Sequence, residues 1–419
     1  MDWQKKTLYP ISIPIPFLMR YVFPVLLLLL LSCAGTHTGE SQASLIGTYQ
    51  LTFETDTADY QAHLALNQAP DGVFCGQLNH QPAHNWPDAV LLTQQSGDSL
   101  HLKVGFGDQL TVARSGDTLE GIFYDNDVGH PAQLYRVSDT VSTRIQQMTS
   151  IAPLRIVGPE GKRLQEVRWP TPIDGQSFYF ANLRGDYPGI MRAQQAGDEW
   201  QAELLKGQVD YNLSAMDLAP EGSFMVLHGS PRDSTWPSYG KSDLYYAELN
   251  AVGDSFTQIT LLPAPINGPS FDIFPALRGD SVVLYCAWNR STGQGRGDLY
   301  EAPLSGPPFT ARPYACGALN TPQVEAGPYE DPQQRFIMYH RNTRNPFSPD
   351  HLYFAARENG KWEEPVKMVP PINSTGYEFS PRLDPAEEYF YWCSDRRAST
   401  QIFRLPVSEV QELRPYFGP

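Results

Sequence analysis

Short runs of alternating apolar and polar residues occupy the chain from Leu45 to about Ser138. Eight such runs fit into about 90 residues, and Gly, Asp, Asn or Pro separates them. Period-two alternation bounded by turn residues is typical of antiparallel strands. Because eight short strands can curl into a closed sheet, this segment predicts a small closed or nearly closed β-barrel over residues 45–138.

A second pattern, with a period of 53 residues, occupies the rest of the chain. It is carried by Asn267, Asn320 and Asn373, by Asp272, Glu325 and Glu378, by Pro275, Pro328 and Pro381, and by Phe256, Phe309 and Trp362. Each unit also holds an aromatic run such as EYFYWCS and a run such as HLYFAAR, and two looser units precede them. Units of this length with about four strands each are typical of β-propeller blades, since one blade cannot bury both of its faces alone.

The repeat predicts a five-bladed propeller, because residues 151–415 have the length of five 53-residue units. The fifth unit ends without a convincing outer strand, whereas PLRIVGP at residues 153–159 resembles PVKMVPP at residues 365–371, an outer strand of the fourth unit. We therefore expect this early segment to form the missing outer strand beside residues 400–407. A ring closed by an N-terminal strand would leave no open sheet edge.

Two resemblances follow from these motifs. INSTGYEFSPRLDPAEEYFYWCSDR, and its weaker copies upstream, resemble the WD-like repeats of the TolB-type periplasmic propellers and their lipoprotein relatives. The resemblance covers residues 151–415, is clearest in the last three units, and implies a binding platform rather than a reaction. Gly47-Thr48-Tyr49 resembles the opening of lipocalin-like barrels, and two alternatives remain for the barrel interior: a ligand cavity, or a core filled by side chains.

The start of the chain reads as a targeting signal. A basic start at Met19-Arg20, an apolar stretch over 21–31 and the sequence LLSCA resemble a bacterial lipoprotein signal, in which Cys33 becomes the acylated first residue. We expect the natural start at Met19, and a polar tether over residues 34–44. The alternative is a retained transmembrane anchor, for which eleven apolar residues are short. Ala34, in place of Asp, points to the outer membrane on its periplasmic side.

Composition narrows the classes of partner and chemistry. A net charge of -15 argues against nucleic acid and anionic membrane surfaces, so contact with the membrane is expected through the lipid anchor only. The other four cysteines have no CxxC spacing and are interpreted as small buried residues. His80 and His84 lack a third ligand at useful spacing, so neither a metal nor a cofactor is expected.

Repeated charged residues are the first candidates for a site. The acids of the repeat precede the first strand of a unit, and each loop between the second and third strands carries Arg, including Arg290 and Arg396. A basic rim on an acidic protein is a candidate site for anions or carboxylates. The structural alternative is that the acid and the Arg of neighbouring loops pair with each other.

Unrepeated loop residues are the better candidates for specificity. They lie in GSPRDSTWPSYGKSD and RNTRNPFSPDH, and comprise Arg232, Trp236, Tyr239, Lys241, Arg344 and Phe347. Exposed aromatics beside Arg commonly anchor protein and glycan partners. We therefore predict a binding or scaffold module for an envelope protein or glycan, with two alternatives: a purely structural module, and a polysaccharide-acting enzyme that uses Asp272, Glu325 and Glu378 around the axis.

Overall fold

A computed structural model gives the fold of most of the chain after the predicted signal. It describes residues 45–54, 59–81, 88–96, 99–104, 108–115, 118–125, 128–185, 187–208, 211–232, 238–304, 314–315, 317–342 and 349–417. The predicted lipoprotein signal, Cys33 and the tether lie outside these residues. Among the described helices, none has the length and apolar character needed to cross a bilayer.

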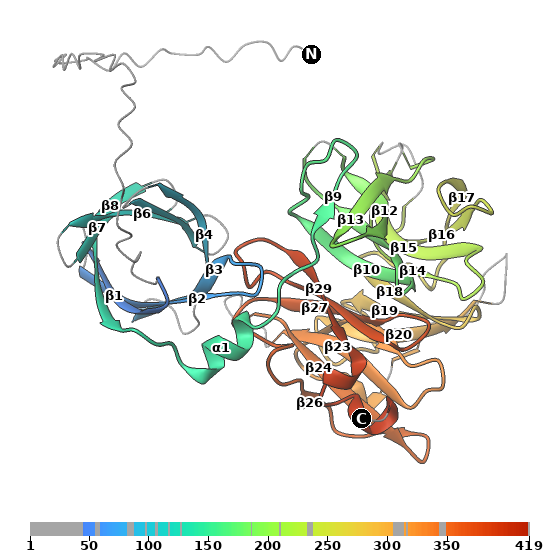
Figure 1. Cartoon of the computed structure of the whole chain (residues 1–419). Helices are drawn as coiled ribbons and strands as arrows, with labels where there is room; N and C mark the ends of the chain where they lie inside the picture. The colour runs from blue at the N-terminus through green and yellow to red at the C-terminus, as the bar shows by residue number, and fades with distance from the viewer. Residues whose placement is uncertain are drawn as a thin grey trace, which may run out of the picture. The chain divides into compact units, whose positions relative to one another are not determined.

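Eight antiparallel strands form a closed barrel (Figure 1). The strands are β1 (Gly47–Glu54), β2 (Asp59–Gln68), β3 (Phe74–Gln81), β4 (Asp88–Ser96), β5 (Ser99–Val104), β6 (Asp108–Ser115), β7 (Thr118–Asp125) and β8 (Val128–Ser138). Each strand pairs with its neighbour in sequence, and β1 also pairs with β8. The predicted closed barrel is therefore confirmed.

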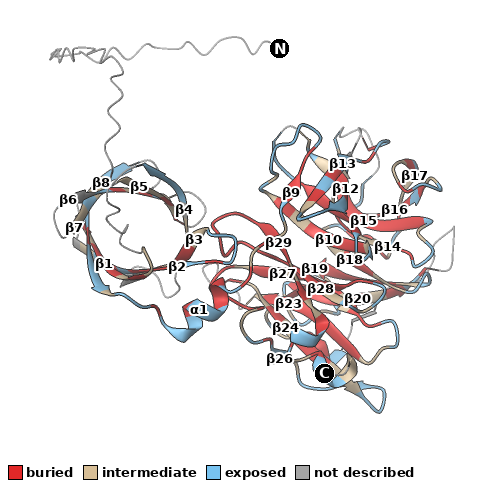
Figure 2. Ribbon diagram, in the orientation of Figure 1, coloured by how far each residue is buried: buried red, intermediate tan, exposed pale blue. Residues whose placement is uncertain are grey.

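Alternation along the barrel strands sends one set of side chains inward. In β5, Leu100, Leu102 and Val104 are buried while the residues between them are partly exposed. All eight strands contribute buried apolar residues to one core cluster, and Figure 2 shows the buried positions along the strands. Of the two alternatives for the interior, the structure favours a core lined by packed apolar side chains. The helix α1 (Thr143–Thr149) follows the barrel, with Ser142 as its N-cap.

The described strands after β9 fall into four sheets, and we divide the nine-stranded one into two, which gives five successive groups. They are β10 to β13 (Val167–Asp174, Ser177–Asn182, Gly189–Ala196, Glu199–Leu204); β14 to β17 (Tyr211–Leu218, Phe224–Pro231, Asp243–Leu249, Phe256–Leu261); β18 to β21 (Asp272–Arg278, Val282–Trp288, Gly297–Pro303, Tyr314–Ala315); β22 to β26 (Val324–Glu330, Phe336–Asn342, His351–Glu358, Lys361–Trp362, Val366–Lys367); and β27 to β29 (Glu378–Leu383, Tyr389–Ser394, Gln401–Pro406). Within each group the successive main strands pair antiparallel. A single parallel bridge between Gly297 and Val324 joins the third group to the fourth.

The first strands of these groups contact one another in cyclic order. β10 contacts β14, β14 contacts β18, β18 contacts β22, β22 contacts β27, and β27 contacts β10. Sheets that stand around a common axis with their first strands innermost form a propeller-type fold. The chain is therefore an all-β protein in which a propeller-type region follows a closed barrel.

The prediction that residues 153–159 form the outer strand of the last group is wrong. Only one hydrogen bond joins the early segment to the last group, from the Leu154 N–H to the Ile402 carbonyl at 2.8 Å. The segment then turns away, and β9 (Ile156–Val157) pairs in parallel with β13 of the first group. The last group has three strands. Ile156 packs in the core between the first and last groups, so apolar packing rather than an exchanged strand closes the ring.

One irregularity recurs in the first strand of every group. The pairing between the first and second strands shifts register after Arg168, Leu213, Ile273, Ala326 and Phe379. Four of the five residues that follow are held at positive φ: Trp169 (57°), Phe274 (55°), Gly327 (59°) and Ser380 (55°). Such a bulge re-aims a side chain, and it turns these four positions away from the regular alternation of the strand.

Candidate functional site

The repeated asparagines hold successive groups together. The Asn373 amide accepts a hydrogen bond from the Leu352 N–H at 2.8 Å and donates to the Leu352 and Met368 carbonyls at 2.9 and 2.7 Å. Asn267 and Asn320 make the same pair of bonds to Leu244 and Leu299. Each Asn precedes the first strand of one group and binds the third strand of the group before it. Its recurrence therefore has a structural cause.

The repeated acids form the second part of this network. Asp272, Glu325 and Glu378 are at most 1% exposed. Asp272 accepts from Arg290 at 2.6 Å, and a Glu325 oxygen lies 2.9 Å from the Arg341 Nε. Burial raises the pKa of Asp272 and of Glu325, and the Arg partner opposes the shift in both. None of the three acids lines the pocket described below, so the enzyme alternative loses its named acids.

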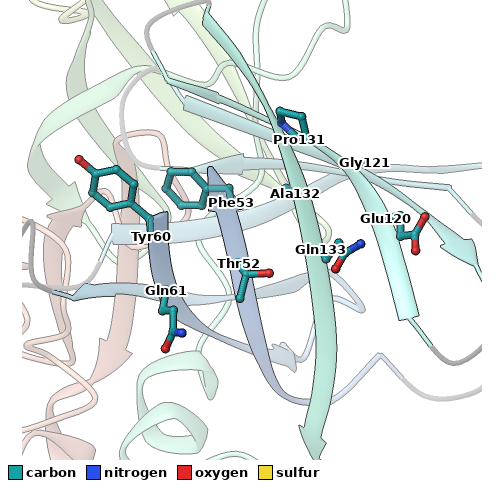
Figure 3. A pocket seen from close by; sticks show the side chains of 9 residues that line it. All are labelled: Thr52, Phe53, Tyr60, Gln61, Glu120, Gly121, Pro131, Ala132 and Gln133. Carbon is teal, nitrogen blue, oxygen red and sulfur yellow. The ribbon is translucent and has the colours of Figure 1, made fainter. Parts of the chain in front are cut away.

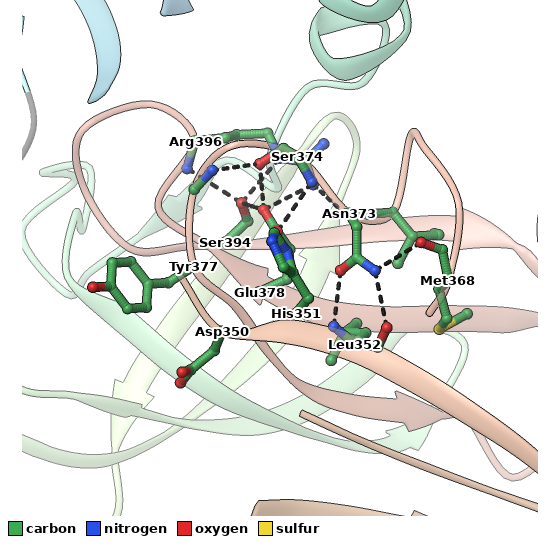
Figure 4. A network of polar contacts seen from close by, with 12 residues as sticks. Asp350, His351, Leu352, Met368, Asn373, Ser374, Tyr377, Glu378, Ser394 and Arg396 are labelled. Carbon is green, nitrogen blue, oxygen red and sulfur yellow. Dashed lines mark hydrogen bonds and ion pairs between the residues drawn. The ribbon is translucent and has the colours of Figure 1, made fainter. Parts of the chain in front are cut away.

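Figure 4 shows the network of the last group around Glu378. Its carboxylate accepts from the Ser394 hydroxyl at 2.8 Å and from the Ser374 N–H at 3.0 Å, and the Arg396 guanidinium lies 3.5 Å away. Arg396 also donates to the Pro371 carbonyl at 2.7 Å. We call the repeated Asn, the acids and their Arg partners (Arg290, Arg341 and Arg396) the girdle. The girdle satisfies its charges internally, as the structural alternative predicted.

The candidate binding residues fall into three classes. Arg290 and Arg396 belong to the girdle, with 17% and 4% of their side chains exposed. Arg232, Tyr239 and Lys241 are exposed, and the Lys241 Nζ lies 5.5 Å from the Phe271 ring centroid. Trp236, Arg344 and Phe347 lie outside the described residues. None of the described candidates lines the pocket near the propeller axis that is described below. A role in binding at these residues therefore stays a prediction.

Five aromatic rings, one from each strand group, close a cycle around the axis. Their centroids are separated by 5.7 Å (Trp169 to His228), 5.1 Å (His228 to Phe274), 5.5 Å (Phe274 to His340), 6.1 Å (His340 to Phe379) and 6.5 Å (Phe379 to Trp169). We call this set the aromatic collar. Edge-to-face and tilted contacts at these distances are the geometries that aromatic rings favour.

The two histidines of the collar are neutral near pH 7. Burial lowers the pKa of His228 to about 3, and its Nδ1 accepts from the Phe274 N–H at 3.0 Å. Burial also lowers the pKa of His340. Gly327 makes room for the His340 ring, because a Cβ at this position would lie 2.6 Å from the His340 Nδ1. The collar therefore presents five uncharged rings.

A pocket of about 180 Å³, which we call the axial pocket, lies against one side of the collar. Its described lining residues come from the first, third, fourth and fifth strand groups: Arg168, Trp169, Phe274, His340, Asp350, Tyr377, Phe379, Asp395 and Thr400. At roughly 30 Å³ for each water molecule, the pocket has the volume of about six waters. It therefore fits one small ring rather than an extended ligand.

Two acids of the pocket differ in environment. Burial raises the pKa of Asp395 to about 7, and the nearby charge of Glu378 adds to the shift. One Asp395 oxygen accepts from the Tyr377 N–H at 2.6 Å. Asp350 is partly exposed and accepts from the Asn342 amide at 2.6 Å. The pocket thus offers one buried carboxyl whose pKa is raised to about 7 and a second, less buried carboxyl.

Arg382 fills the axis beyond the collar. It donates to the carbonyls of Pro275, Pro328 and Pro381, which directly follow collar or bulge positions, at 2.8 to 3.0 Å. Its Nε lies 3.8 Å from an Asp217 oxygen. A side chain that donates to the backbone of three groups ties these groups together.

Barrel strands line a separate, larger open pocket of about 690 Å³, part of whose lining, including Gln61, Glu120 and Gln133, is exposed (Figure 3). Four strands line it, through Thr52, Phe53, Tyr60, Gln61, Glu120, Gly121, Pro131, Ala132 and Gln133. Phe53 and Tyr60 stack at 5.1 Å. Glu120 is the one charged residue in this described lining, so charged groups converge in the axial pocket and do not converge here.

The axial pocket was not predicted from the sequence, although the repeat contains a variable position that indicates it. In the last three units an acid precedes the bulge and a Pro follows it, and a Pro also follows the bulge of the first unit. The residue just before this Pro differs in all four: Trp169, Phe274, Gly327 and Ser380. A position that varies inside a constant repeat is free of the structural role that fixes its neighbours. A comparison of this position between the units indicates Trp169 and Phe274 as candidates for a site.

Comparisons with known proteins give structural similarity only. No family model and no curated protein matches the chain. Among solved structures, a structure described as TolB from Agrobacterium tumefaciens is 14% identical, covers 56% of this chain and 73% of that chain, and has a TM-score of 0.35. A thermostable family-43 glycoside hydrolase is 14% identical over 59% of this chain and 91% of that chain, with a TM-score of 0.42.

A third similar structure is a xylan beta-1,4-xylosidase from Bacillus halodurans C-125. It is 12% identical over 57% of this chain and 53% of that chain, with a TM-score of 0.41. These neighbours are propellers, and they do not separate a TolB-like family from other propeller proteins. Similarity at this level says nothing of activity, so function must be argued from the residues of this chain.

Proposed function

We propose that this protein is a lipid-anchored envelope protein whose propeller binds one sugar ring of a glycan in the axial pocket. The observation that carries the proposal is a small pocket in which Trp169, Phe274 and Phe379 meet the polar groups of Asp350, Asp395 and Arg168. Sugars present apolar C–H faces and polar edges, and this combination of aromatic faces and charged hydrogen-bonding groups complements both.

Backbone strain at the collar supports a functional reading. Trp169 and Phe274 have φ angles of 57° and 55°, a region that costs a bulky residue on the order of 1–3 kcal/mol. Ser and Gly occupy equivalent positions in the fifth and fourth groups at φ 55° and 59°, so the bulge itself does not require an aromatic ring. Rings retained under strain beside a pocket are the kind of outlier that points to binding.

The finer features of the fold and location belong to the same proposal. The cyclic contacts of β10, β14, β18, β22 and β27 and the five rings of the collar support five blades. The lipoprotein-like sequence around Cys33 supports an anchor in the outer membrane, with the propeller on the periplasmic side. A glycan is favoured over a protein partner, because the pocket joins aromatic faces to charged hydrogen-bonding groups within the space of about one ring.

A glycan array tests the binding proposal. The purified full-length protein in detergent is expected to bind a subset of glycans that share a terminal residue. Phe274→Leu should weaken binding about 10-fold, as loss of one stacking ring removes about 1 kcal/mol or more. Phe271→Leu is the matched control, since Phe271 lies three residues away and does not line the pocket. Equal losses in both variants, or binding by neither protein nor variant, would contradict the proposal.

A second candidate function, hydrolysis of a glycosidic bond in the same pocket, is favoured by one observation. Asp395 has a pKa of about 7, and a carboxyl that keeps its proton near neutral pH suits a general acid. Asp350 would then act as the partner carboxylate. Incubation of the protein with the glycans that it binds distinguishes the two functions: release of a sugar that Asp395→Asn abolishes indicates hydrolysis, and unchanged glycan indicates binding alone.

The anchor has an independent test. Cys33→Ser should abolish incorporation of labelled palmitate and release the protein from the membrane fraction, because a thioether-linked lipid cannot form at Ser. Ser32→Ala, next to it, should leave both unchanged. Membrane association that survives Cys33→Ser would instead support the transmembrane alternative for the apolar stretch at 21–31.

A further inference from the structure

Arg168 differs from the other arginines around the propeller axis. Arg290, Arg341, Arg382 and Arg396 each donate hydrogen bonds to carboxylates, carbonyls or a hydroxyl. The Arg168 side chain makes no hydrogen bond among the described residues: its ion pair with Glu166 is long, at 3.6 Å, and its Nε, like those of Arg341 and Arg382, is buried without a hydrogen-bond partner. A buried guanidinium N–H that lacks an acceptor is costly, so an acceptor from outside the chain would stabilise it.

Arg168 lines the pocket, so a bound ligand could supply such an acceptor. Its Cζ lies 5.9 Å from the ring centroids of both Trp169 and Phe379, which line the same pocket. The two rings restrict the guanidinium, while 29% of the side chain remains exposed. A planar, restrained guanidinium is suited to bidentate binding of a carboxylate.

We infer that the sugar bound in the axial pocket is a uronic acid, whose carboxylate pairs with Arg168 while its ring packs against the collar. The inference rests on the proposed function and adds the substrate class to it. A carboxylate would give the Arg168 guanidinium, whose ion pair within the chain is the 3.6 Å contact to Glu166, a charged acceptor, whereas a neutral sugar offers only uncharged hydroxyl acceptors.

The acids of the pocket give this binding a pH dependence. Asp395 faces the charges of Glu378, Arg168 and Arg396, and Asp350 and His340 share its pocket. Once its proton is lost, Asp395 repels a bound carboxylate; while protonated, it is a hydrogen-bond donor. Since burial raises the pKa of Asp395 to about 7, uronate binding is expected to strengthen as the pH falls from 8 to 6, a range in which the uronate itself stays ionised.

Isothermal titration of the full-length protein with single sugars tests the inference. The probes are glucuronate and galacturonate, the neutral sugars glucose and galactose, and the methyl esters of the two uronates. One uronate is expected to bind at least about 10-fold more tightly than its neutral sugar and its ester, given that charged hydrogen bonds contribute about 1.5–3 kcal/mol. Alanylalanine and its amide probe a peptide carboxylate as the alternative source of the same chemistry.

Two variants of Arg168 and one control complete the experiment. Arg168→Gln should weaken uronate binding about 10- to 100-fold and neutral sugars less than about 3-fold; Arg168→Lys keeps the charge and should restore part of the affinity. Arg155→Gln removes the same charge from an exposed site, 62% exposed and paired with Glu199, and should change nothing. Thermal unfolding of each variant checks that it is folded.

The outcomes separate the inference from the function on which it rests. Equal affinities for uronate and neutral sugar, in wild type and Arg168→Gln alike, overturn the uronate inference and leave sugar binding standing. A dipeptide that binds as tightly as either uronate overturns the substrate class. Absence of binding by every sugar overturns the proposed function together with the inference.

Discussion

The girdle and the axial pocket use the same residue types in opposite ways. In the girdle, Glu378 is buried and accepts hydrogen bonds from serine and backbone partners beside Arg396. In the pocket, the Arg168 side chain has no hydrogen-bond partner among the described residues, and Asp395 keeps its proton up to about pH 7. Internally paired charges hold sheets together, whereas incompletely paired charges beside aromatic rings are available to a ligand.

Repeated and unrepeated residues of the propeller-type region have different roles. Residues that recur every 53 positions, such as Asn320 and Glu325, make equivalent bonds in three units, to the backbone of the preceding group and to a backbone N–H four residues earlier, and those bonds explain their recurrence. Residues that differ between units at one position, such as Trp169 and Phe274, face the shared axis, where no two units need the same side chain. Substitutions at the two kinds of position should therefore change different properties.

Glu378→Gln should have the largest effect on stability. The change leaves Arg396 buried without its carboxylate, and breaking a buried ion pair costs about 3–5 kcal/mol of unfolding free energy. Urea denaturation of wild type and variant measures the loss. Glu364→Gln, at an exposed glutamate, should stay within about 0.5 kcal/mol of wild type. Similar small changes in both variants would show that the girdle does not hold the sheets together.

Asp395→Asn should have the next largest effect on the free energy of unfolding, and above about pH 4 it should stabilise the protein. In the folded protein Asp395 keeps its proton up to about pH 7, whereas an unfolded Asp loses it near pH 4. The folded state thus binds more protons between these values, so this group makes stability fall as the pH rises from about 4 to 7. Asn cannot ionise and removes this fall.

The expected size follows from the same shift. The measured quantity is the unfolding free energy of Asp395→Asn minus that of wild type. This difference should be about 2–4 kcal/mol more favourable to the variant at pH 8 than at pH 4. Urea denaturation at both pH values measures it. Asp198→Asn, at an exposed position, should show the same pH dependence as wild type. A parallel pH profile in Asp395→Asn would mean that Asp395 is ionised in the folded protein and belongs with the paired acids.

Asn373→Ala should cost somewhat less than the Glu378 variant, about 2–3 kcal/mol. It leaves the Leu352 N–H and the Met368 carbonyl without their Asn373 partner, whereas the Leu352 carbonyl keeps its bond from the Met368 N–H. Unsatisfied buried groups cost about 1–3 kcal/mol each before relaxation. Thermal unfolding compared with Asn212→Ala, an exposed asparagine, measures the difference. The affinity of the folded variant for sugar should be unchanged, which sharpens the separation between girdle and pocket.

Tyr239→Ala combined with Lys241→Ala should have the smallest effect. Both side chains are exposed, so unfolding free energy should change by less than about 0.5 kcal/mol. Because neither residue lines the axial pocket, affinity for the sugar should change by less than about 2-fold. A large loss of glycan or protein binding in a pull-down from envelope extract would instead place the binding surface on these loops.

Pattern and periodicity sufficed for the barrel and for the strand groups. Alternation in runs such as SLHLKV appears directly as the buried and partly exposed positions of β5. The 53-residue spacing marked the acids and asparagines, whose bonds lie within a unit or between neighbours. Local patterns can predict such contacts, because the repeat itself supplies the register.

Long-range choices could not be predicted in this way. PLRIVGP has the same pattern whether it pairs with β29 or with β13, and the choice depends on how Ile156 packs between two distant groups. The pocket combines residues from four groups, and it depends on positive φ at Trp169 and Phe274. Nothing in the one-dimensional pattern specifies which side chains a bulge turns toward the axis.

A crystal structure of the protein grown with glucuronate or galacturonate tests the central claim most directly. We expect density for one sugar ring in the axial pocket, packed against Phe274 or Phe379, with its carboxylate within hydrogen-bond distance of Arg168. Density at Tyr239 and Lys241, with the axial pocket holding only water, would contradict it.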